Sequence, residues 1–98
     1  MKILFGNKKI ERICTQNDFA LRKFGLDMSE KIEQRISELM SFETVNQLIY
    51  FSVGRCHPLQ GKRKGQYAMD LVHPYRLIFV KKESKIEIVQ IIEIVDYH

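Results

Sequence analysis

The sequence has few of the features that mark membrane-embedded or secreted proteins. None of its apolar runs approaches the roughly 20 residues that a membrane-spanning helix needs. Residues 1–6 lack the long apolar stretch and the small-residue cleavage site of a signal peptide. The two cysteines, Cys14 and Cys56, lie far apart and form no CxxC pair, which favours reduced and packed thiols. We therefore expect a cytoplasmic protein without a membrane partner.

Internal repeats, low-complexity segments and linkers are also missing. A chain of 98 residues has room for one domain with one core. Its composition, 45% hydrophobic and 29% charged, is ordinary for a globular fold. The sequence therefore predicts a single domain over residues 1–98.

Acidic residues are scarce in one quarter of the chain. Residues 55–82 hold seven lysines and arginines but one acid, Asp70, whereas residues 1–54 hold eight basic and seven acidic residues. The net charge of +4 is therefore concentrated in this segment. Such a segment is either a solvated charged surface or a binding surface for nucleic acid.

The first half of the sequence predicts a short strand followed by helices. Residues 3–5 are an apolar run before a Gly-Asn pair, and residues 8–24 carry spaced apolar positions. Residues 28–42 show the clearest helical spacing, with Asp27 three residues before Glu30 as a capping-box-like start. A short helical turn is expected over residues 44–50.

The second half predicts three strands after a polar stretch at residues 52–66 that is punctuated by glycine and proline. The expected strands are residues 66–72, 75–80 and 85–97, which form an antiparallel meander. The predicted fold class is α+β, with an N-terminal strand and helices packed on a small antiparallel sheet.

The last predicted strand is apolar on both faces, which favours a central position in the sheet. Period-two geometry places Asp96 and His98 on one face and Tyr97 on the other. The same count divides the apolar residues into two sets: Ile86, Ile88, Ile92 and Ile94, and on the other face Val89, Ile91 and Val95. The chain would thus end as part of a sheet, with a carboxylate, a phenol and an imidazole at its tip.

The polar stretch could bind phosphate. Glycines allow close approach of the backbone to a ligand, and lysine and arginine neutralise phosphate charge. The candidate RNA-binding residues are Arg55, Lys62, Arg63 and Lys64. The spacing is not that of a Walker loop. A mobile basic loop is the alternative interpretation.

Five further side chains could do chemistry. Arg76 stands in an otherwise apolar run and could stabilise charge on a phosphate, or it could simply be exposed on a strand. His73 is expected to be a solvated turn residue. His57 and His98 could supply the general base and general acid of one reaction, as self-cleavage of RNA through its 2′-hydroxyl requires. Asp96 could orient an imidazole and Tyr97 could stack on a base.

Three blocks of the sequence together resemble the HigB-type toxins of the RelE/ParE toxin–antitoxin superfamily. They are RCHPLQGKRKGQY at residues 55–67, HPYRLIF at residues 73–79 and the closing DYH at residues 96–98. The resemblance is strong in the C-terminal half and holds only in outline for the helical half. It implies a RelE-like fold and a ribosome-dependent endoribonuclease that cuts mRNA. It also implies a helix-turn-helix antitoxin of HigA type as the partner.

The resemblance also implies roles for individual residues. His57 matches a catalytic histidine, Arg76 a phosphate-contacting arginine, and Asp96, Tyr97 and His98 the closing catalytic triplet. Some members have lysine where this chain has Gln60, so Lys62 or Lys64 would have to take over that role. The expected reaction is attack of the 2′-hydroxyl on the adjacent phosphorus, with no metal ion or other cofactor required.

Two other functions fit the same sequence. One is a non-catalytic toxin of this fold that blocks a target such as DNA gyrase, since the superfamily contains such inhibitors. The other is an inactive relative kept as an antitoxin-binding partner, which the Gln60 departure keeps open.

Overall fold

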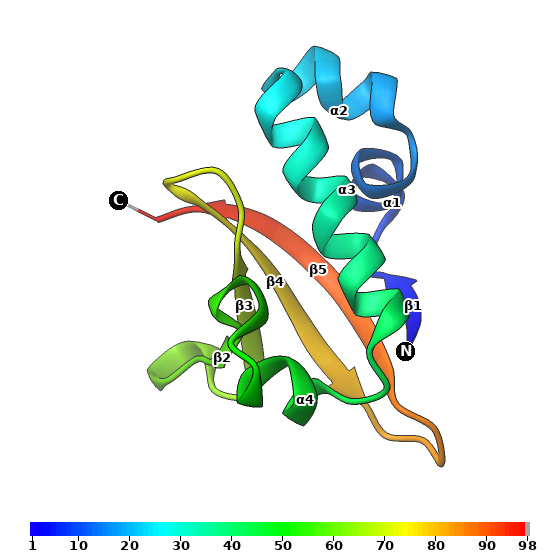
Figure 1. The fold of residues 1–98 in the computed structure, drawn as a ribbon, viewed down its shortest axis with the longest axis vertical. Helices are drawn as coiled ribbons and strands as arrows, with labels where there is room; N and C mark the ends of the chain where they lie inside the picture. Colours follow the sequence, from blue (N-terminus) through cyan, green and yellow to red (C-terminus); the bar gives the residue numbers. More distant parts are fainter. Residues whose placement is uncertain (98) are drawn as a thin grey trace.

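The protein combines a helical N-terminal half with a five-stranded sheet (Figure 1). The structure is a computed structural model and describes residues 1–97. Its helices are α1 (Lys8–Thr15), α2 (Asn17–Phe24), α3 (Leu26–Ser41) and α4 (Val45–Tyr50). Its strands are β1 (Lys2–Phe5), β2 (His57–Pro58), β3 (Gln66–Asp70), β4 (Tyr75–Lys82) and β5 (Ile88–Asp96). The predicted α+β class is confirmed.

The strands lie in the order β1-β5-β4-β3-β2. Neighbours from β2 to β5 pair antiparallel, as the predicted meander requires, and β1 pairs parallel with β5. The predicted central position of the last strand is confirmed, because β5 lies between β1 and β4. The sequence did not predict β2, which has two residues and falls within the polar stretch.

One face of the sheet packs against the helices, and we call it the helix-side face. All four helices contribute to its core cluster, together with the strand residues Met69, Leu71, Leu77, Phe79, Val89 and Ile91. Strand alternation sends Ala68 and Ile78 to the opposite face, which we call the outer face. Both are fully buried although they do not belong to the helix-side cluster. No helix within residues 1–97 is long and apolar enough to cross a membrane.

A β-bulge changes the face of the second half of β5. Ile78 pairs with Glu93 whereas the next residue of β4, Phe79, pairs with Ile91, so Ile92 is the extra residue. The prediction that Ile88 and Ile94 share one face, and Ile91 and Val95 the other, was therefore wrong. Ile94 instead packs against the helix-side core.

The helix starts differ in how they are capped. The predicted cap at Asp27 was wrong, because α3 begins at Leu26 and Asp27 lies inside its first turn. Gly25 precedes α3 with a φ of 90°, a conformation that favours glycine. For α4 the predicted start is confirmed, and Thr44 and Gln47 form a reciprocal capping box.

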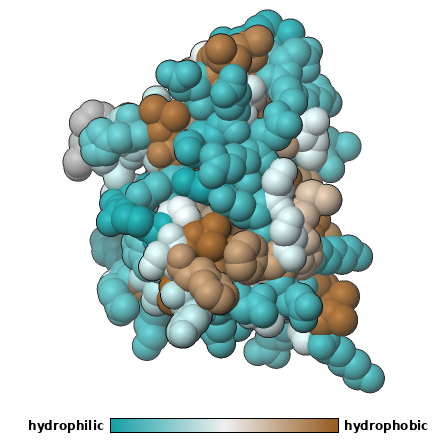
Figure 2. Space-filling model, in the orientation of Figure 1, coloured by the Kyte–Doolittle hydropathy of each residue, from teal (hydrophilic) through white to brown (hydrophobic). Residues whose placement is uncertain are grey.

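A cluster of aromatic side chains lies at the surface near α4. The ring of Phe51 contacts those of Phe42 and Tyr50, at centroid distances of 6.4 and 4.9 Å. Tyr50 is 80% exposed and Phe51 is 64% exposed. Figure 2 shows a hydrophobic patch on an otherwise largely hydrophilic face of the molecule.

Candidate functional site

Strand register brings a row of four residues together on the outer face of the sheet. His57 of β2 lies opposite Ala68 of β3, which lies opposite Ile78 of β4, which lies opposite Glu93 of β5. Directly opposed residues of antiparallel strands point to the same side. A small residue and an aliphatic residue thus form the floor between an imidazole and a carboxylate.

A second row places the predicted phosphate-binding arginine beside the end of β5. Arg76 lies opposite Asp70 on one side and Val95 on the other. Its guanidinium carbon lies 4.6 Å from the centroid of the Tyr97 ring, a cation–π contact. The Tyr97 backbone N–H donates to the Pro74 carbonyl oxygen at 2.9 Å and so ties the end of β5 to the β3–β4 turn (Figure 1).

Tyr97 is the last residue that the structure describes, and it contacts Arg76. His98 lies outside the described residues. Asp96 does not share the outer face, because it lies opposite Tyr75, which packs against the helix-side core. Asp96 and Tyr97 therefore point to opposite faces, as period-two geometry predicted.

Asp70 links two arginines on the outer face. Arg55 donates to the Asp70 carboxylate through Nε at 2.5 Å and Nη2 at 3.2 Å, and Nε of Arg76 lies 3.6 Å from Oδ1. The hydrogen bond from Arg55 lowers the pKa of Asp70 from its ordinary value, although burial opposes the shift. The charges of Arg55, Arg76 and His57 act in the same direction as that hydrogen bond.

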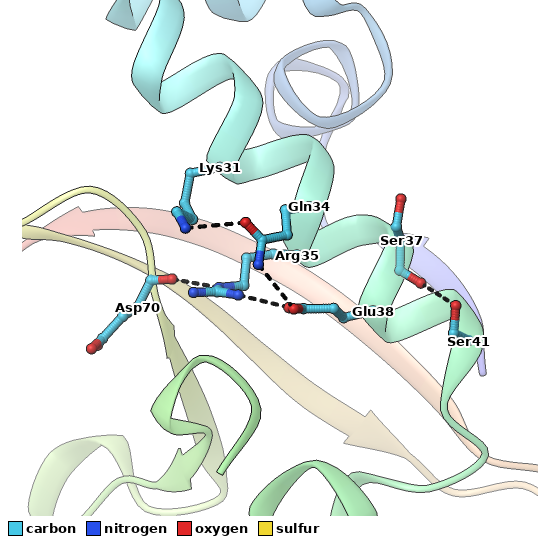
Figure 3. Close-up of polar contacts among 7 residues, drawn as sticks. All are labelled: Lys31, Gln34, Arg35, Ser37, Glu38, Ser41 and Asp70. Atoms are coloured by element: carbon cyan, nitrogen blue, oxygen red, sulfur yellow. Dashed lines mark hydrogen bonds and ion pairs between the residues drawn. The ribbon is translucent and has the colours of Figure 1, made fainter. Parts of the chain in front are cut away.

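A third arginine holds Asp70 from the other side (Figure 3). Nε of Arg35, a buried residue of α3, donates to the Asp70 backbone carbonyl at 2.6 Å. Nη1 of Arg35 donates to Glu38 on the same helix at 2.7 Å. Figure 3 shows the Asp70 carboxylate pointing away from Arg35. The backbone of Asp70 is therefore anchored to the helical layer while its side chain faces the other arginines.

The turn that presents Arg55 has an unusual backbone. Ser52, Gly54 and Arg55 all have left-handed conformations, with φ values of 53°, 57° and 51°. A Cβ atom on Gly54 would lie 2.7 Å from Nε of Arg35, so only glycine fits there without displacing that side chain. A left-handed arginine costs on the order of 1 kcal/mol, and such strained residues concentrate at functional sites.

The contacts of His57 define its tautomer. Its Nδ1 lies 2.6 Å from the Arg55 backbone oxygen. A carbonyl oxygen only accepts hydrogen bonds, so Nδ1 carries the proton and Nε2 is the accepting nitrogen of the neutral ring. His57 can therefore take a proton from another group through Nε2.

The predicted basic loop is tied to the sheet through Arg63. Nη1 of Arg63 donates to Glu93 at 2.6 Å and to Gln66 at 2.8 Å, so this side chain reaches from the β2–β3 loop across to β5. The hydrogen bond with Glu93 raises the pKa of Arg63. Lys62 and Lys64 are exposed on the same loop.

A small cavity of about 70 Å³ lies where these groups meet. Its lining includes Arg55, Asp70, His73, Arg76 and Tyr97. Sequence reasoning had set His73 aside as a turn residue and gave no role to Asp70. The available signal was that Asp70 is the one acid among residues 55–82.

A larger hollow, of about 740 Å³, lies at the opposite end of β4 and β5 from Arg76 and Tyr97. Its charged lining mixes both signs: Glu43, Lys81, Lys82, Glu83, Lys85 and Glu87. No group of three His, Cys, Asp or Glu side chains suited to a metal ion occurs within residues 1–97. The outer face near Arg76 is therefore the candidate site, and it carries cations, two carboxylates, an imidazole and a phenol.

Comparisons with known proteins support the fold. No protein-family model matches the chain, and no curated protein sequence matches it. A toxin has the same fold. It is the YoeB/ParE toxin from Agrobacterium tumefaciens, and the match covers 100% of both chains with a TM-score of 0.67 and 16% sequence identity. The chain therefore shares the fold of that protein. The assignment to the toxin superfamily, the HigB type, the activity and the partners stay predictions.

Proposed function

We propose that this protein is a HigB-type toxin of a toxin–antitoxin system and cuts ribosome-bound mRNA. The observation that carries the proposal is the contact between Arg76 and Tyr97 on the face that also bears His57. A cation for the phosphate, a ring for a base and an imidazole for proton transfer are the groups that metal-independent RNA cleavage needs.

In the proposed reaction the 2′-oxygen attacks the adjacent phosphorus and the 5′-oxygen leaves. Arg76 stabilises the negative charge that develops on the phosphate oxygens. Nε2 of His57 takes the proton of the 2′-hydroxyl, because Nδ1 is committed to the Arg55 carbonyl. His98 then protonates the leaving oxygen. The products are a cyclic or 3′-phosphate and a free 5′-hydroxyl.

The remaining predicted residues have supporting roles in the proposal. Tyr97 stacks on a base and Asp96 orients the tail of the chain. Lys62 and Lys64 are exposed and contact the RNA backbone. Arg55 and Arg63 join them, although each also has a carboxylate partner inside the protein.

The proposed partners follow from the proposed activity. They are the ribosome with its mRNA, in the cytoplasm, and a helix-turn-helix antitoxin of HigA type that neutralises the toxin. The fold shared with a YoeB/ParE toxin supports this assignment.

The test is expression under tight control, followed by growth measurement and mapping of mRNA 5′ ends. We expect growth arrest and new 5′ ends with the natural chain, and neither with Arg76→Ala or His98→Ala. Arg22→Ala is the matched control, because it removes the same charge from an exposed site on α2. Growth arrest without new mRNA ends would favour a gyrase-type inhibitor, and growth without arrest an inactive relative.

A further inference from the structure

We propose that Asp70 is a positioning residue that holds Arg55 and Arg76 together as a two-arginine clamp for one phosphate group of the RNA backbone. The inference rests on the proposed function, since it takes RNA as the ligand. No role was expected for Asp70 from the sequence, and its side chain does not have to touch the reacting atoms.

The first argument for the clamp is the geometry of the Asp70 carboxylate. Asp70 uses Nε and Nη2 of Arg55 and approaches Nε of Arg76. Each guanidinium has five N–H groups, so both arginines keep donors that Asp70 does not use. Both side chains also line the small cavity, together with Tyr97. The unused donors are thus available for an anion at that cavity.

The second argument is the charge balance among Asp70, Arg55 and Arg76. Two guanidinium groups side by side repel each other unless an anion lies between them. With Asp70 between them, the three side chains carry a net charge of +1, which matches the single negative charge of one phosphodiester group. Asp70 therefore reduces the repulsion between the two guanidinium groups in the free protein. The remaining net charge of +1 still attracts the RNA backbone.

The third argument is that the Asp70 backbone is itself held in place. Its backbone pairs with Arg76 across β3 and β4, and its carbonyl accepts a hydrogen bond from the buried Arg35. Side chains held by strands and by buried hydrogen bonds keep their geometry better than side chains on free loops. Asp70 can therefore fix Arg55, which is exposed on a turn, relative to Arg76 on a central strand.

The proposal makes an unusual prediction for Asp70→Asn. This variant loses the group that orients both arginines. It also removes one negative charge, so the net charge of the face that binds RNA rises by one. Binding to the RNA backbone should become tighter while cleavage becomes slower. A merely structural role would weaken both, because a partly unfolded protein binds and cleaves less.

Two measurements test the prediction. The first is the anisotropy of a fluorescein-labelled 2′-O-methyl oligoribonucleotide, which cannot be cut, titrated at several KCl concentrations. We expect Asp70→Asn to bind several-fold tighter at low salt, with a slope of log K against log[KCl] steeper by about 0.7, the value for one more contact to a single strand. The second is cleavage of ribosome-bound mRNA, which should fall at least tenfold.

Asp18→Asn is the matched control, because it removes the same charge from an exposed ion pair on α2. It should change neither the salt slope nor cleavage. In the double variant Arg55→Ala with Asp70→Asn, the gain in slope should disappear, since the freed guanidinium is gone. An Asp70→Asn protein that cleaves normally, or that binds the oligonucleotide more weakly, would overturn the proposal.

Two further outcomes keep the inference separate from the proposed function. If the natural chain cuts no RNA, the anisotropy series still tests the clamp, because an unchanged slope in Asp70→Asn rules it out. If Asp70→Asn does not fold, Asp70→Glu replaces it. We expect Asp70→Glu to keep the natural salt slope with intermediate cleavage, and a changed slope contradicts the proposal.

Discussion

At the scale of single residues, the outer face is organised around two carboxylates that each hold an arginine from another segment. Asp70 holds Arg55, and Glu93 holds Arg63. Surface ion pairs of this kind contribute little to stability, typically about 0–1 kcal/mol. Their effect here is geometric, because they fix cations of a turn and a loop against the sheet.

Substitution of Gly54 tests whether the buried Arg35 holds the turn that presents Arg55. We expect Gly54→Ala to lower the free energy of unfolding by about 1–3 kcal/mol, because its Cβ would displace the buried, hydrogen-bonded Arg35 and because alanine disfavours a φ of 57°. Urea denaturation measures the loss. Gly61→Ala is the control, since Gly61 has a φ of 63° with open space around it. Equal losses in the two variants would mean that Arg35 does not hold the turn.

The pH dependence of stability tests the Asp70 ion pairs. The pKa of Asp70 is lowered in the folded protein, so the unfolded chain binds this proton more readily. The contribution is fully present above the ordinary value of 3.8 and is lost as the pH falls through the folded value. The difference in unfolding free energy between the natural chain and Asp70→Asn should therefore shrink between about pH 5 and pH 2. A constant difference over that range contradicts this account.

At the scale of elements, the sequence predicted the helices and strands whose residues show a clear apolar pattern. It missed the features that depend on pairing between strands. Alternating residues identified β3, an apolar run after the His-Pro turn identified β4, and helical spacing identified α3. The two residues of β2 carry no period, and only their pairing with β3 makes them a strand. The sequence also did not predict the bulge in β5 opposite Ile78 and Phe79. The residues of one strand do not show where its pairing with the neighbouring strand shifts by one residue.

The capping box of α4 is an element-scale feature with a measurable energy. Thr44 accepts a hydrogen bond from the Gln47 backbone N–H, and the Gln47 side chain accepts one from the Thr44 backbone. We expect Thr44→Ala to lower the free energy of unfolding by about 1 kcal/mol, as loss of such a cap usually does. Thr44→Ser keeps the hydroxyl and should lose much less. Calorimetry on both variants checks this, and equal losses would show that packing of the methyl group, not the cap, matters.

At the scale of the whole molecule, residues about forty positions apart converge on one face. The family resemblance led us to expect this convergence for His57, Arg76 and the tail, and the fold places the first two and Tyr97 on the outer face. The part played by Asp70 could not be predicted, because it depends on the register of β3 against β4 and on a contact from α3. Sequence position alone does not give either.

The two thiols report on how cooperatively the molecule opens. Burial raises the pKa of Cys14 and of Cys56 to about 12, so both stay protonated and shielded at pH 8. We expect a thiol reagent to label both cysteines slowly and at the same rate in the native protein, and rapidly in urea. Mass spectrometry of digested protein separates the two sites. Much faster labelling of Cys56 would show that the segment before β2 opens independently of the core.

The central claim is that the outer face cuts RNA with Arg76 opposite the phosphate. The most direct measurement is single-turnover cleavage of mRNA on purified ribosomes by the natural chain, Arg76→Ala and the control Arg22→Ala. We predict cleavage products with a cyclic or 3′-phosphate, an Arg22→Ala rate equal to that of the natural chain, and an Arg76→Ala rate at least about 100-fold lower. Cleavage by Arg76→Ala at the natural rate, or intact mRNA with the natural chain, would contradict the account.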